Sequence, residues 1–151
     1  MTYYSKDTDI LMQFYKTLKH TPENNEYEAI VNKIFCSADS YDVKQINNIF
    51  KDYLKSHKKI KISPRTLLRL ATLFSKSNNL IEATTIIESL LRKSADIDGL
   101  NQALFALSTA YQRLGDSENY IKCLRLLASH YPNQSMGINA NRILETKDRA
   151  Q

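Results

Sequence analysis

A pattern of apolar residues repeats in this chain at a fixed separation of 37 residues. This offset relates the set Leu67, Leu70, Ala71 and Phe74 to the set Leu104, Leu107, Ser108 and Tyr111. Steps of three and four residues place each set on one face of an α-helix. The offset also relates Ile87 to Leu124 in the segment that follows each set. The pattern therefore predicts a helix–turn–helix unit that occurs twice.

Backbone-breaking residues are few and fall where the apolar pattern is interrupted. The 151 residues include three glycines and three prolines, and the spacing between them is helical throughout. Hydrophobic residues make up 42% and charged residues 25%, an ordinary globular composition for about one domain. We expect an all-α domain of about eight helices stacked as antiparallel hairpins. Its parts are N-terminal helices over 1–62, repeats over 63–97 and 98–133, and a capping helix over 134–151.

Local signals mark several helix ends and faces. Ser63 followed by Pro64 is the clearest start, because serine caps a helix and proline suits the first helical position. A helix over about 7–19 is expected to have an apolar face of Ile10, Leu11, Phe14 and Leu18. Ser40 is the expected cap of a helix that carries Ile46 and Phe50.

The two repeated units resemble the tetratricopeptide repeat, whose pattern is bulky, Leu-Gly, Tyr, Ala, aromatic and Pro over about 34 residues. The stretch ALFALSTAYQRLGDSENYIKCLRLLASHYPNQ carries most of these features, and TLLRLATLFSKSNNLIEATTIIESLL carries fewer. Tyr120 stands where the family has Ala, and Asn78 replaces the turn glycine. A degenerate upstream copy contains Ile30, Ile34, Ile46, Phe50 and Tyr53. The resemblance implies a short right-handed superhelical array that binds other proteins, as an adaptor, scaffold, chaperone-like protein or assembly factor.

The sequence offers little for catalysis. His20, His57 and His130 are predicted at helix ends without metal-ligand spacing, and no nucleotide, hydrolase or metalloprotease motif occurs. Cys36 and Cys123 are too far apart for a metal or disulfide motif, and we interpret them as small buried hydrophobic residues. We therefore expect no enzyme activity, no cofactor and no metal.

Cations recur along the helix after Pro64. Arg65, Arg69, Thr72 and Lys76 follow at steps of four, three and four, on one helix face. The 37-residue offset places Gln102, Thr109 and Arg113 on the equivalent face, with Leu68, Phe105 and Gln112 beside it. In tetratricopeptide arrays the first helix of each unit lines a concave peptide groove. The resemblance thus implies a peptide-binding groove formed by these residues, and its cations suit an acidic or C-terminal segment. A solvated charged face is the alternative interpretation.

Two other kinds of partner stay open. The chain could self-associate, for example as a homodimer, through apolar residues near its ends: Tyr3, Tyr4, Phe14, Met136, Ile143 and Leu144. The net charge of +5 and the basic run Lys55, His57, Lys58, Lys59 and Lys61 suit nucleic acid, but acidic residues interrupt a continuous basic surface and no nucleic-acid motif occurs. The sequence has no signal-peptide pattern and no run long enough for a membrane helix, so we expect a cytoplasmic protein without membrane insertion.

Overall fold

The computed structural model describes residues 4–57 and 60–149, with side chains from Thr8 onward. This part of the chain forms eight α-helices and one short 3₁₀ helix and contains no β-strand, which confirms the all-α prediction. Helices adjacent in sequence pack against each other in pairs. The chain divides into two compact units, residues 1–73 and 74–151, and the division falls inside a helix, α4 (Pro64–Lys76).

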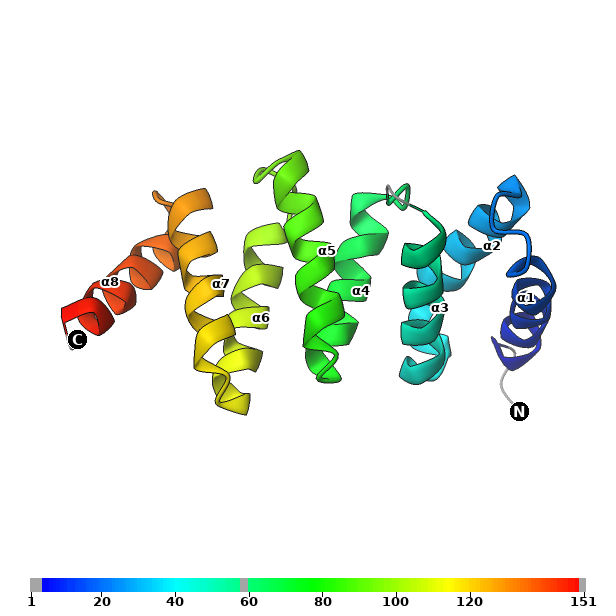
Figure 1. The fold of residues 1–151 in the computed structure, drawn as a ribbon, viewed down its shortest axis with the longest axis horizontal. Helices are drawn as coiled ribbons and strands as arrows, with labels where there is room; N and C mark the ends of the chain where they lie inside the picture. Colours follow the sequence, from blue (N-terminus) through cyan, green and yellow to red (C-terminus); the bar gives the residue numbers. More distant parts are fainter. Residues whose placement is uncertain (1–3, 58–59, 150–151) are drawn as a thin grey trace. The chain divides into compact units, whose positions relative to one another are not determined.

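Unit 1 contains α1 (Tyr4–Leu18), α2 (Asn25–Cys36), the 3₁₀ helix η1 (Ala38–Ser40), α3 (Val43–Ser56) and most of α4. Figure 1 shows these elements from blue to green. Packing joins α1 to α2 and α2 to α3, and η1 touches both α1 and α3. The largest fully buried side chains of this unit are Tyr27, Tyr53, Phe35, Phe50, Ile34, Ile46, Ile62, Leu67 and Leu70. Its core is thus rich in aromatic rings, which bury more apolar surface per side chain than aliphatic residues.

Side-chain caps begin most helices of unit 1. Asn24 caps α2 by accepting from the amide of Glu26 at 2.9 Å. Ser63 accepts from the amide of Thr66 at 3.3 Å, which confirms the predicted start of α4 at Pro64. Ser40 is not the cap of α3, because it ends η1 and Asp42 accepts from the amide of Lys44 at 2.8 Å instead. An oxygen one residue from the helix fits this capping geometry, and Ser40 lies too far upstream.

Unit 2 contains the last turn of α4, then α5 (Leu80–Lys93), α6 (Leu100–Leu114), α7 (Ser117–His130) and α8 (Ser135–Arg149). Figure 1 shows these helices from green to red. Packing joins α5 to α6, α6 to α7 and α7 to α8. Short turns connect α6 to α7 and α4 to α5, and both contain left-handed residues, Gly115 at φ 75° and Asn78 at φ 63°. Asn tolerates this conformation better than most side chains, which is why it can replace the turn glycine.

The positions related by the 37-residue offset are buried as predicted. Phe74 is fully buried and Tyr111 is 4% exposed. The small residues Ala71, Ala83 and Ser108 are also buried. Ser37, at the equivalent position of the upstream copy, is exposed and ends α2. The offset therefore identifies core positions in both units, but it does not show that the chain belongs to the tetratricopeptide family.

Several expected core residues are exposed instead. Ile10 and Phe14 are 45% and 54% exposed, since α1 turns Tyr15 inward. Leu114, which continues the apolar spacing of α6 and was expected in the core, is 56% exposed in the last turn of that helix. Cys36 is exposed at the end of α2, so it is not a buried hydrophobic residue, whereas Cys123 is buried. Burial raises the pKa of the Cys123 thiol to about 12.

Candidate functional site

The basic stripe in unit 1 lies on the solvent side of α4. Arg65, Arg69 and Thr72 are exposed and Leu68 is half-buried, while Leu67 and Leu70 face the core. At 3.6 residues per turn the four stripe positions lie on the arc opposite those two leucines. No carboxylate of the described residues lies within ion-pair distance of Arg65 or Arg69. Both guanidinium groups are therefore available for an anionic partner.

The equivalent stripe in unit 2 lies on α6. Gln102, Phe105, Gln112 and Arg113 are exposed and Thr109 is half-buried, on the arc opposite the buried Leu104 and Leu107. Phe105 is 48% exposed, a large fraction for an aromatic side chain. Lys76, in the last turn of α4, is exposed as well. The described part of the chain places no carboxylate within ion-pair distance of Arg113 or Lys76.

The two threonines of the stripes are already engaged as donors. Thr72 Oγ1 donates to the carbonyl oxygen of Leu68 at 2.9 Å, and Thr109 Oγ1 donates to that of Phe105 at 3.1 Å. A hydroxyl has one proton to donate, so in this arrangement neither threonine can donate to a carboxylate. Within each unit, recognition of an acidic group would depend on the cations. The single groove lined by all ten residues stays a prediction.

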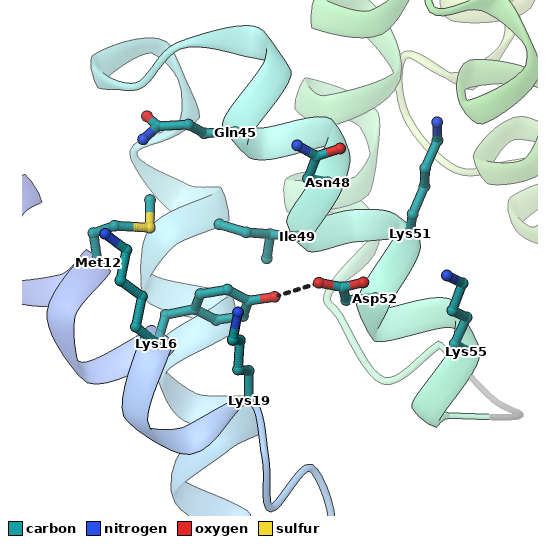
Figure 2. A pocket seen from close by; sticks show the side chains of 10 residues that line it. Met12, Lys16, Lys19, Gln45, Asn48, Ile49, Lys51, Asp52 and Lys55 are labelled. Atoms are coloured by element: carbon teal, nitrogen blue, oxygen red, sulfur yellow. Dashed lines mark hydrogen bonds between the residues drawn. The ribbon is translucent and has the colours of Figure 1, made fainter.

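Sequence reasoning did not identify a cleft in unit 1, between α1 and α3 (Figure 2). Its volume is about 430 Å³. The lining residues are Met12, Tyr15, Lys16, Lys19, Gln45, Asn48, Ile49, Lys51, Asp52 and Lys55. Four of these are lysines and one is an aspartate, so formal positive charge exceeds negative charge by three. The sequence feature that could have indicated this cleft is two pairs of lysines at helical spacing, Lys16 with Lys19 and Lys51 with Lys55.

A buried tyrosine fixes the carboxylate of this cleft. The Tyr15 hydroxyl donates to Asp52 Oδ2 at 3.0 Å, the dashed line in Figure 2. The Tyr15 ring is buried and lies 6.0 Å from the ring of Tyr27, centroid to centroid. Burial, together with the hydrogen bond to Asp52, raises the pKa of Tyr15 far above its ordinary value. The phenol therefore stays protonated at neutral pH and holds the carboxylate in place.

The histidine at the end of α3 has a packing role. The His57 ring stacks on Tyr53 at 4.5 Å and on Tyr27 at 5.7 Å between centroids. Tyr53 in turn donates to Glu28 Oε1 at 3.3 Å and accepts from the amide of Lys61 at 3.0 Å. This cluster joins α2, α3 and the segment before α4. The expected basic run is thus interrupted by a packed ring at 57, and Lys58 and Lys59 lie outside the described residues.

Two searches for other kinds of site gave no candidate. Across residues 4–57 and 60–149, no group of three or more His, Cys, Asp or Glu side chains could hold a metal ion. In the same part of the chain, no helix is long and apolar enough to cross a membrane.

Comparison with known proteins does not assign the chain to a family. No protein-family model matches its sequence. Searches of curated protein sequences and of solved structures likewise gave no significant match. Any inference about function therefore depends on the geometry of the molecule itself.

Proposed function

We propose that this protein is a protein–protein interaction module that binds an acidic segment of its partner through the exposed faces of α4 and α6. What supports the proposal above all is the exposed arc of α6. There Phe105, 48% exposed, and Arg113 lie about two turns apart on the same exposed arc, and Arg113 has no ion-pair partner among the described residues. Exposed aromatic and arginine side chains together are typical of binding hot spots.

The face of α4 contributes the same chemistry in the other unit. Arg65 and Arg69 are one helical turn apart, so their side chains are neighbours on the surface. Guanidinium groups bind carboxylates through paired hydrogen bonds, which favours acidic side chains or a C-terminal carboxylate as the target. The resemblance to the tetratricopeptide repeat, in which the first helix of each unit contacts a peptide, points to the same two helices. An adaptor, scaffold, chaperone-like or assembly role follows from this interpretation, and no catalytic step is proposed.

The test begins with capture of a partner and continues with charge reversal. A partner recovered from the source cell is assayed for binding to the double variant Arg69→Glu/Arg113→Glu, and we expect binding to fall at least tenfold at low salt. A matched control reverses two exposed arginines elsewhere, Arg92→Glu/Arg125→Glu. Partner binding that is equal in the two double variants would overturn the proposal. The single variants Arg69→Glu and Arg113→Glu measure the separate contributions of α4 and α6 to partner binding.

The aromatic part of the proposal has its own variant. Phe105→Ala should weaken partner binding several-fold and leave the melting temperature nearly unchanged, because about half of the ring is already in solvent. Melting curves recorded by circular dichroism provide the folding control. An unchanged affinity would show that the partner contacts α6, if at all, only through charge.

Self-association is the second candidate. Ile10 and Phe14 lie one turn apart on α1, and each is about half exposed. Such a pair on one helix face suits a contact between copies of the chain. Sedimentation equilibrium over a wide concentration range tests this, and a monomer at all concentrations would exclude it.

A further inference from the structure

The cleft between α1 and α3 is chemically different from the faces of α4 and α6. It is a hollow between two helices of unit 1, whereas those faces are exposed helix surfaces. Its volume of about 430 Å³ lies within the usual range of small-molecule sites, about 300–1,000 Å³. The cleft therefore has the size for a small ligand.

Ammonium groups line both sides of this cleft. Figure 2 shows Lys16 on α1 and Lys19 just after it across from Lys51 and Lys55 on α3. Among the described residues, no carboxylate lies within ion-pair distance of Lys16, Lys19 or Lys55. The carboxylate between them, Asp52, accepts a hydrogen bond from Tyr15. A cleft with this excess of like charge attracts anions.

The lining also changes character along its length. On both helices the uncharged residues precede the lysines: Met12 on α1, and Gln45, Asn48 and Ile49 on α3. In Figure 2, Gln45 and Met12 lie at one end, toward which the side chain of Lys16 extends, and Lys19 and Lys55 lie away from it. The cleft thus pairs apolar and amide side chains with ammonium groups. This pairing suits a ligand with an uncharged organic body and a compact anionic group.

The residue type selects among anions. Arginine binds planar carboxylates through its fork of donors, but arginine does not line this cleft. Lysine acts as a compact point charge and is a common ligand of phosphate. Several ammonium groups around one cleft suit a ligand that carries several negative charges. We therefore propose that the cleft between α1 and α3 binds a small organic phosphate ester, with its phosphates at Lys16, Lys19 and Lys55 and its organic body against Met12 and Ile49.

The first experiment measures binding to the full chain by titration calorimetry at low salt, with ATP, inorganic triphosphate and adenosine as probes and magnesium omitted. We expect ATP to bind most tightly, triphosphate more weakly and adenosine not detectably. Raising the salt to about 0.3 M should weaken ATP binding, because surface charges are then screened. Absence of ATP binding at millimolar concentration would overturn the proposal. Equal affinity for ATP and triphosphate would overturn the role of Met12 and Ile49.

The second experiment locates the site. Lys16→Ala/Lys55→Ala should weaken ATP binding about tenfold, the loss of roughly 1.4 kcal/mol from two partly exposed charges. Lys33→Ala/Lys44→Ala removes two exposed lysines of the same unit that do not line the cleft, and it should bind ATP nearly as the wild type does. Equal weakening in both double variants would mean only general attraction to a basic protein. That outcome would contradict the proposal.

Asp52 provides a variant with the opposite expected sign. Asp52→Asn removes the negative charge from the cleft, while the amide oxygen can still accept from the Tyr15 hydroxyl. ATP binding should become several-fold tighter, an effect that damage to the fold would not produce. Weaker or unchanged binding would contradict the proposal.

Two further measurements separate this site from the protein-binding faces. Arg69→Glu/Arg113→Glu should leave ATP binding to unit 1 intact, so the two proposals can fail independently. A hexaglutamate peptide that binds with the same dependence on Lys16 and Lys55, while ATP does not bind, would assign the cleft to acidic peptides. That result would overturn the phosphate proposal.

Discussion

The buried tyrosines Tyr15 and Tyr53 of unit 1 and Tyr111 and Tyr131 of unit 2 donate to different kinds of acceptor. In unit 1, Tyr15 and Tyr53 donate to the carboxylates of Asp52 and Glu28. In unit 2, the hydroxyl of Tyr111 donates to the carbonyl oxygen of Leu80 at 3.2 Å. Tyr131 donates in the same way to the carbonyl oxygen of Ala95 at 2.9 Å.

The acceptors are charged side chains in unit 1 and backbone carbonyl oxygens in unit 2. Asp52 is exposed and Glu28 is half-buried, and of the two contacts Tyr15–Asp52 lines the basic cleft. A backbone carbonyl can be reached only where helices and turns approach closely, as at Gly137 on α8. A Cβ at that position would lie 1.8 Å from the carbonyl oxygen of Tyr131. Substitutions in the two units should therefore have different consequences.

The largest effect is expected in unit 2, for Tyr111→Ala. The ring is 4% exposed, and its hydroxyl lies 2.7 Å from Thr84 Oγ1 in addition to its bond to Leu80. Removing a buried aromatic side chain costs about 3–5 kcal/mol of unfolding free energy through lost burial and the cavity left behind. Urea unfolding followed by circular dichroism measures this cost. A loss below about 1 kcal/mol would show that the position can be repacked.

The next effect tests close packing directly. Gly137→Ala should destabilise the protein by about 1–3 kcal/mol, because the added methyl group forces α8 away from the backbone before it. Asn139→Ala, an exposed substitution on the same helix, should cost less than about 0.5 kcal/mol. Thermal melts of the two variants make the comparison. Similar melting temperatures would mean that the α7–α8 contact is not tight.

A pair of tyrosine variants sharpens the contrast between the units. Tyr53→Phe removes both the donor to Glu28 and the acceptor of the Lys61 amide, so it should cost about 1–2 kcal/mol. Tyr131→Phe removes one donor from a backbone carbonyl and should cost about 1 kcal/mol. Chemical denaturation measures both losses. A larger loss for Tyr131→Phe would reverse the expected order.

The smallest effect is expected from the Cys123 thiol, whose pKa burial raises from 9.0 to about 12. Above the ordinary pKa the unfolded chain loses this proton and the folded chain keeps it, so stability falls as pH rises. Between about pH 8 and pH 10 the thiol should account for a loss of about 1 kcal/mol. Denaturation of the wild type and of Cys123→Ala across this range isolates the contribution. Cys36→Ala, at an exposed thiol, is the matched control.

Helix starts and core faces could be predicted because they depend on residues close together in the sequence. Ser63 and Pro64 lie within one turn of the amides that they affect, and the positions of Leu67, Leu70 and Phe74 follow from helical spacing alone. Where a serine and an aspartate compete to cap one helix, as Ser40 and Asp42 do for α3, the outcome depends on η1. This short helix contains Ser40 and packs against α1 and α3.

The face that α1 buries was predicted less well. Ile10, Phe14 and Tyr15 lie on overlapping arcs of the helix, and spacing does not reveal which arc meets a neighbour. Tyr15 is the buried residue of the three because Asp52 on α3 accepts a hydrogen bond from its hydroxyl and Tyr27 on α2 lies beside its ring. Both partners are distant in sequence.

The sequence by itself therefore determined the helical class, the start of α4 and the core positions related by the 37-residue offset. All of these follow from local hydrogen bonding and from the 3.6-residue period. Only the tertiary structure decided that the lysines at 16, 19, 51 and 55 line one cleft, and that Tyr15 rather than Phe14 is buried. Both outcomes depend on which helices pack together, and packing depends on side-chain shape and on partners far apart in the chain.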